Sequence, residues 1–82
     1  MNRTSEDAWI SQVVATLRES LSRSDMPILD IEWLILRCED TLRYTGDLRH
    51  ASARQLIKDL ESFNSRFPGA LSQQLLLGPM QS

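Results

Sequence analysis

The sequence predicts an all-α fold, a small bundle of three main helices plus a short fourth helix at the C-terminus. Apolar residues recur at spacings of three and four along most of the chain, which is the period of an amphipathic helix. Proline and glycine stand between these periodic segments, where helices end. The 82 residues suffice for one domain, whose helices we expect to be joined by short loops and to lie antiparallel to their neighbours.

The first helix is predicted over residues 5–22. Thr4 or Ser5 is the expected N-cap, because a side-chain oxygen there accepts a hydrogen bond from a free backbone N–H group. Polar residues such as Gln12 and Glu19 fall on the side that faces away from the core. The apolar residues predicted to face the core are Trp9, Ile10, Val13, Val14, Leu17 and Leu21.

The second helix is predicted over residues 27–45, with Asp25 as its cap and Gly46 as its left-handed terminator. A strand is the competing interpretation of residues 28–35, in which apolar side chains partly alternate with charged ones. We favour the helix because the chain offers no second strand for pairing, and an isolated strand is not stable.

Two sets of apolar residues compete for the core side of this second helix. The stripe expected to face the core is Ile28, Ile31, Leu34, Ile35, Cys38 and Leu42. Leu29, Trp33 and Leu36 lie off the centre of that stripe and make the apolar side unusually wide. Because two neighbouring helices do not obviously cover so wide a surface, these three residues are predicted either to lie under the fourth helix or to contact a partner.

The third helix is predicted over residues 48–67 and is expected to begin near Asp47 or Ser52. Ser52 and Gln55 have the spacing of a capping box, which would make the preceding residues a loop or a separate turn. Pro68 ends this helix because it disfavours helical geometry at the residue before it. The apolar residues predicted to face the core are Leu48, Ala51, Leu56, Ile57, Leu60, Phe63 and Phe67.

The short fourth helix is predicted over residues 69–77. Its inward-facing residues are predicted to be Leu71, Leu75 and Leu76. Gly78 and Pro79 stop this helix, because neither residue continues helical geometry well. Residues 79–82 are predicted to form a disordered tail.

The charge pattern bears on nucleic-acid binding. The net charge is −2, with eleven acidic residues spread along the chain and nine basic ones. A mildly acidic chain without a basic run does not favour tight, sequence-independent binding of DNA, which depends on many contacts between basic side chains and phosphates. A DNA-binding transcriptional regulator is the alternative function, with Arg49, Arg54 and Lys58 of the third helix as its contacts.

Residues that carry most catalytic chemistry are scarce in this chain. His50 is the only histidine, and nothing in the sequence activates it as a general base; together with Asp47 it fits the start of a helix better. Cys38 is the only cysteine and is predicted to be a buried apolar residue rather than a nucleophile. No ligand spacing predicts a metal site, and no glycine-rich loop predicts a cofactor site. We therefore predict no enzyme activity and no cofactor.

The apolar surplus of the second helix predicts a small protein-interaction module, such as an adaptor, regulator, inhibitor or secretion-type chaperone. The residues predicted to contact the protein partner are Leu29, Trp33, Leu36 and Arg37. A symmetric homodimer is expected as well, because a small helical domain has a marginal core of its own. No stretch is long and apolar enough for a membrane span and the first residues show no signal-peptide pattern, so the expected localisation is the cytoplasm.

Overall fold

The computed structural model describes residues 2–23 and 25–81, with side chains for 6–23 and 25–79. Within this part of the chain it contains helices and connecting segments and no strand. The helices are α1 (Asn2–Leu21), α2 (Ile28–Arg43), α3 (Gly46–Arg66), α4 (Gln73–Leu76) and the 3-10 helix η1 (Gly78–Gln81). The predicted all-α bundle of three main helices plus a short C-terminal helix is confirmed, and residues 28–35 are helical.

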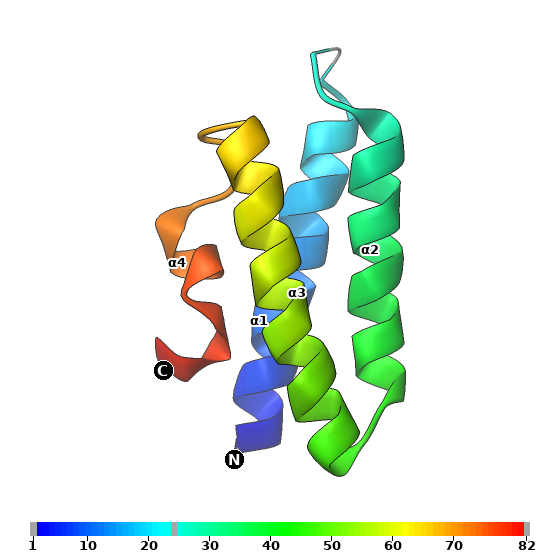
Figure 1. Cartoon of the computed structure of the whole chain (residues 1–82), viewed down its shortest axis with the longest axis vertical. Helices are drawn as coiled ribbons and strands as arrows, with labels where there is room; N and C mark the ends of the chain where they lie inside the picture. The colour runs from blue at the N-terminus through cyan, green and yellow to red at the C-terminus, as the bar shows by residue number, and fades with distance from the viewer. Residues whose placement is uncertain (1, 24, 82) are drawn as a thin grey trace.

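The three long helices lie side by side, and α4 and η1 return along the side of α1 and α3 that faces away from α2 (Figure 1). Each long helix turns one apolar stripe toward the centre, where the stripes meet in a single core. The central core residues are Ile10, Val13, Leu17, Ile31, Leu34, Cys38, Leu56, Leu60 and Phe63. Removal of these side chains from water, at roughly 25 cal/mol per Å² of apolar area, is the main force that holds the helices together.

The N-terminal ends of α1 and α2 differ from the prediction. Thr4 and Ser5 lie within α1, so neither residue caps it. The N-cap of α2 is Pro27, which makes no side-chain capping hydrogen bond, while Asp25 forms an exposed ion pair with a neighbouring arginine. A capping side chain must stand directly before the first helical residue, and Asp25 is too far from Ile28 to do so.

The connection between α2 and α3 lies earlier in the chain than the predicted residues 46–47. α2 ends at Arg43, and after two extended residues α3 begins at Gly46. Gly46 has φ of +59°, but it opens α3 and does not terminate α2. Ser52 lies inside α3, where its hydroxyl oxygen is 2.7 Å from the hydroxyl oxygen of Thr41 in α2. The predicted capping box of Ser52 and Gln55 is therefore wrong, because the hydroxyl is used between helices.

Several apolar residues near the helix ends are exposed although the prediction places them in the core. Leu48 is 69% exposed, and Ala51 is exposed too, because the first turns of α3 extend past the end of α2 (Figure 1). Ile28 and Leu42, at the two ends of the predicted core stripe of α2, are also exposed. Helical periodicity assigns one face along the whole helix, whereas neighbouring helices cover only part of that length.

The C-terminal segment is fixed to α1 by a buried hydrogen bond. Trp9 Nε1 donates to the carbonyl oxygen of Leu75 at 2.8 Å. Ser72 caps α4, because its hydroxyl oxygen accepts a hydrogen bond of 3.3 Å from the Leu75 N–H group. The indole N–H and the first turn of α4 are thus both satisfied, as buried polar groups must be.

The chain beyond α4 is more regular than predicted. The fourth helix covers residues 73–76 and not the whole of 69–77. Gly78 has φ of +83°, which allows the chain to turn and continue as η1 against α1. The predicted disorder of residues 79–82 is therefore wrong for 79–81, and Ser82 lies outside the described residues.

Candidate protein-binding surface

Leu29, Trp33 and Leu36 form one line along the side of α2 that faces solvent, and we call these three residues the outer face of α2. They are spaced by four and three residues, which places them on one side of a helix. Leu29 is 80% exposed, Trp33 is 52% exposed and Leu36 is 59% exposed. An exposed tryptophan between two exposed leucines is the kind of contiguous apolar surface that marks an interface.

The middle of the opposite side of α2 is buried in the core, which explains why the outer face is left over. Ile31, Leu34 and Cys38 are buried against α1 and α3. The fourth helix lies beside α1 and α3 on their side that faces away from α2 (Figure 1). The first of the two predicted alternatives, that the fourth helix covers Leu29, Trp33 and Leu36, is therefore wrong.

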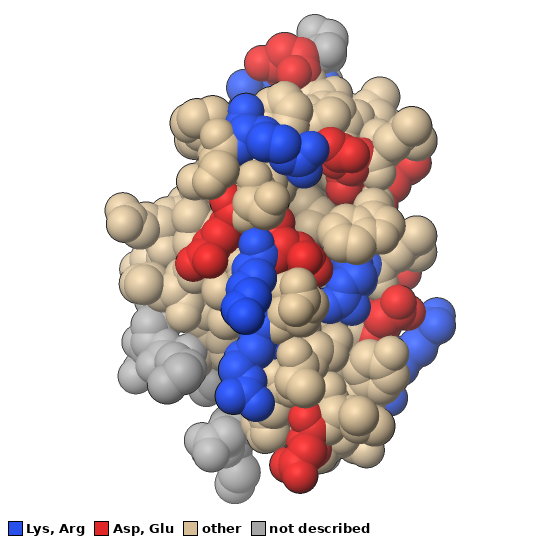
Figure 2. Space-filling model, in the orientation of Figure 1, with Lys and Arg blue, Asp and Glu red and all other residues tan. Residues whose placement is uncertain are grey.

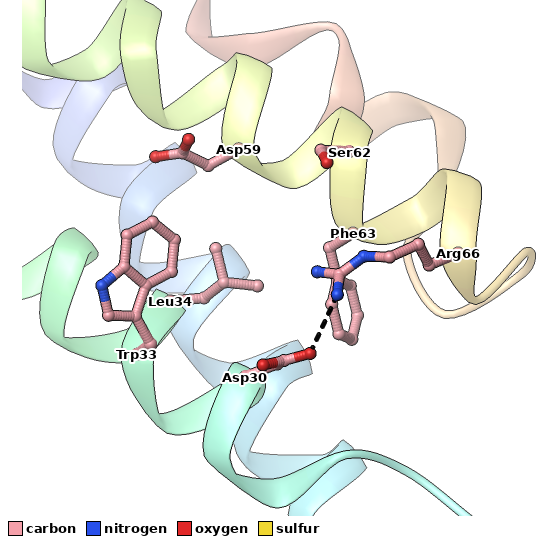
Figure 3. Close-up of a pocket in the computed structure, with 7 residues that line it drawn as sticks. All are labelled: Asp30, Trp33, Leu34, Asp59, Ser62, Phe63 and Arg66. Carbon is pink, nitrogen blue, oxygen red and sulfur yellow. Dashed lines mark hydrogen bonds and ion pairs between the residues drawn. The ribbon is translucent and has the colours of Figure 1, made fainter.

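A shallow groove of about 220 Å³ runs between α2 and α3 beside Trp33 (Figure 3). The indole ring forms one wall of the groove, and the buried side chains of Leu34 and Phe63 lie at its base. Across its other end Arg66 Nη1 contacts Asp30 Oδ2 at 3.1 Å. The outer face of α2 thus borders a hollow with an apolar base and charged edges.

Arg37, which the sequence places with these residues, is held between α2 and α3. Its Nε lies 3.3 Å from Asp59 Oδ2, and its Nη2 donates to the Ser52 carbonyl oxygen at 3.5 Å. Only 20% of its side chain is exposed. Together with the Thr41–Ser52 hydrogen bond, this contact fixes α2 against α3. Arg37 therefore borders the outer face of α2 as a charged group of fixed position.

The three residues proposed for nucleic-acid binding do not form one surface. Arg49 is nearly buried and contacts Glu6 Oε1 at 2.9 Å and the Asp7 carboxylate, in ion pairs that lack hydrogen-bond geometry. Arg54 and Lys58 are exposed on α3. Figure 2 shows basic side chains in a line on this side of the molecule, with acidic side chains on both flanks. Such an arrangement attracts phosphate less than an uninterrupted basic patch does.

The remaining reactive residues stand apart from one another. His50 Nδ1 lies 3.4 Å from Glu6 Oε2, next to the Arg49 ion pairs. Cys38 is buried, and this burial raises the pKa of its thiol from 9.0 to about 12. Among the described residues no group of three or more histidine, cysteine or carboxylate side chains is placed to hold a metal ion. The thiol is therefore a packing group, and the histidine is a partner of a carboxylate.

Two features of the surface were missed at the sequence level. The contacts of Arg49 with Glu6 and Asp7 join residues far apart in the chain, and nothing near Arg49 in the sequence points to them. The groove beside Trp33 depends on how α2 and α3 cross. In the sequence, the one indication of such a groove was that Asp30, Trp33 and Arg37 are spaced by three and four residues and so share one side of the helix.

Comparison with known proteins finds no family model that matches the chain, and no curated protein or solved structure that matches it significantly. None of the helices in the described residues combines the length and the apolar character needed to cross a bilayer.

Proposed function

We propose that the protein is a small non-enzymatic interaction module, such as an adaptor, regulator, inhibitor or secretion-type chaperone of the cytoplasm, that binds a protein partner. The binding surface is the outer face of α2, with Trp33 at its centre. The observation that carries this proposal is the exposure of Trp33 between two exposed leucines on a helix whose other side is buried. Tryptophan is among the residues that most often dominate binding energy at interfaces.

The rigidity of α2 supports the same function. α2 is fixed to α3 by the Arg37–Asp59 ion pair and by the Thr41–Ser52 hydrogen bond. A partner therefore meets a preformed surface and loses little free energy to ordering it. The groove beside Trp33 offers a place for one side chain of the partner, with polar groups at its edges to orient it.

The alternative function, a DNA-binding regulator, has less support. It requires Arg49, whose guanidinium already contacts two carboxylates. Releasing Arg49 for a phosphate would leave the nearly buried Glu6 carboxylate without its nearest cation. Arg54 and Lys58 alone give two phosphate contacts, fewer than specific DNA-binding domains make.

The test is quantitative capture of proteins from the native host, followed by identification and rebinding of the purified partner. We expect Trp33→Ala and Leu36→Glu each to weaken binding of that partner by at least about tenfold. Leu48→Glu is the matched control, because Leu48 is also an exposed leucine but lies at the start of α3, away from the outer face of α2. Equal binding by all three variants would contradict the proposal.

A further inference from the structure

We propose that the outer face of α2 binds a second copy of this chain, with the two α2 helices antiparallel about a two-fold axis beside Trp33. This inference rests on the proposed function, because it names an occupant for the same surface. A two-fold pair uses one patch twice, so the patch must be complementary to itself. The apolar pattern of α2 and the charge pattern on its flank next to α3 have that property.

The apolar pattern reads nearly the same in both directions along the helix. Leu29 stands four residues before Trp33, and Leu36 stands three residues after it. When a second α2 runs in the opposite direction, Leu29 meets Leu36 of the second copy, and the two Trp33 side chains meet at the axis. Alternating steps of four and three residues also form the seam of paired helices. Each exposed apolar side chain is thus offered an apolar partner.

The charges on the flank next to α3 are complementary in the antiparallel arrangement, whereas on the opposite flank Glu32 faces Glu32 of the second copy. Asp30 and Arg37 both lie on the flank next to α3, where they contact Arg66 and Asp59 respectively. An antiparallel two-fold pair sets each flank against the same flank of the other copy, with the order along the helix reversed. Asp30 is three residues before Trp33 and Arg37 is four residues after it. Asp30 therefore faces Arg37 of the second copy with an offset of about 1.5 Å along the axis.

A parallel pair does not give this complementarity. It sets the flank next to α3 against the opposite flank of the other copy, at the same height along the helix. Helical geometry, with about 100° between successive residues, puts Glu32 on that opposite flank. Asp30 would then be repelled by Glu32 of the second copy, while Arg37 would be attracted by Glu39 of the second copy at the same offset, so the parallel pair gains no net attraction. The alignment of the helix dipoles also favours the antiparallel pair.

The apolar surface of the outer face of α2 is small for a stable dimer. The three exposed side chains present a few hundred Å² of apolar area per copy, less than the roughly 800 Å² that each partner contributes to a standard interface. We therefore expect a weak, reversible dimer, whose population depends on protein concentration and which a tighter partner displaces.

Cysteine cross-linking tests the orientation directly. Leu29→Cys and Leu36→Cys are prepared separately with different mass tags and then oxidised, alone and as a mixture. We expect the mixed disulfide dimer of the two variants to be at least about fivefold more abundant than the disulfide dimer of either variant with itself. We also expect Trp33→Cys to form a disulfide dimer with itself. Wild type is the control, because its Cys38 is buried and should not cross-link. Self-linked Leu29→Cys and Leu36→Cys without the mixed product would overturn the antiparallel arrangement.

Charge reversal separates this inference from the proposed function. By sedimentation equilibrium we expect Asp30→Arg to raise the dimer dissociation constant at least about tenfold, while Glu32→Arg, its control on the other flank, changes it less than about threefold. A wild-type protein that stays monomeric at millimolar concentration overturns the self-pairing. If Trp33→Ala still weakens binding of the partner protein in that case, the proposed function holds without self-pairing. If the dimer forms but no purified partner protein needs Trp33 for binding, the proposed function is contradicted instead.

Discussion

The two tryptophans of this chain lie in contrasting surroundings. Trp9 is 5% exposed, lies against the C-terminal segment and donates its indole N–H to the Leu75 carbonyl oxygen. Trp33 is 52% exposed and borders a groove that no other described segment fills. The last turns of the chain, α4 and η1, pack against α1 and α3 on the side that faces away from α2, so they leave the outer face of α2 exposed. One tryptophan therefore serves stability, and the other is free to serve binding.

The largest effect that follows from this comparison concerns the two tryptophans themselves. Trp9→Ala should lower the free energy of unfolding by about 3–5 kcal/mol, because it leaves a cavity and removes the indole donor from the Leu75 carbonyl group of α4. Trp33→Ala should change it by less than about 1 kcal/mol, because the side chain is half exposed. Urea denaturation followed by far-UV circular dichroism, at a concentration below that of dimer formation, gives both values.

A conservative variant refines this first comparison. Trp9→Phe keeps most of the buried ring and removes only the N–H donor, so it should cost about 1–2 kcal/mol and less than Trp9→Ala. Similar losses for Trp9→Ala and Trp33→Ala would mean that the outer face of α2 is part of the stabilising core. In that case the interface proposal loses its basis.

The sequence was sufficient to predict both apolar sides of α2, because helical spacing separates Ile31, Leu34 and Cys38 from Trp33 and its neighbours. It was not sufficient to decide which of these sides would stay open. That depends on the path of the chain after Pro68, which brings α4 back onto α1. Local patterns carry no information on that return.

The charged residues show the same limit of sequence-based prediction. Arg49 was a candidate for phosphate binding because it shares a helix with other basic residues. Its actual partners, Glu6 and Asp7, come from the first helix and meet it only in the folded chain. Arg37 is turned into the contact between α2 and α3 by Asp59, which is equally remote in sequence. Spacing along one helix predicts which residues share a side, but not which charges of another helix will face them.

A smaller effect tests the covered side of the bundle. Gly78 and Gly69 both have positive φ, of +83° and +88°. Alanine at either position should cost about 1–2 kcal/mol for the backbone conformation alone. A Cβ at Gly78 would lie 2.6 Å from Ile57 Cδ1, whereas at Gly69 it would meet nothing within 4 Å. Because Ile57 Cδ1 is the end of a flexible side chain, Gly78→Ala should cost up to about 1 kcal/mol more than Gly69→Ala in thermal or urea denaturation.

Equal losses for these two glycine variants would have a clear meaning. They would show that Ile57 moves aside freely and that the C-terminal turn is only loosely packed on α3. The difference between a covered and an open side of the molecule would then be smaller than the two tryptophans indicate.

The smallest effect at moderate pH concerns the inner side of α2. Burial raises the pKa of the Cys38 thiol from 9.0 to about 12, so the folded protein keeps this proton after the unfolded chain has lost it. The resulting stabilisation is complete below pH 9 and is lost as the pH rises from 9 toward 12. At pH 10 the loss should be about 1 kcal/mol.

Cys38→Ala removes this contribution but keeps every other titrating group, so the wild type should lose stability more steeply than the variant between pH 9 and 10.5. Parallel curves of stability against pH for the two proteins would show that water reaches the thiol. The inner side of α2 would then be less well shielded from solvent than its burial indicates.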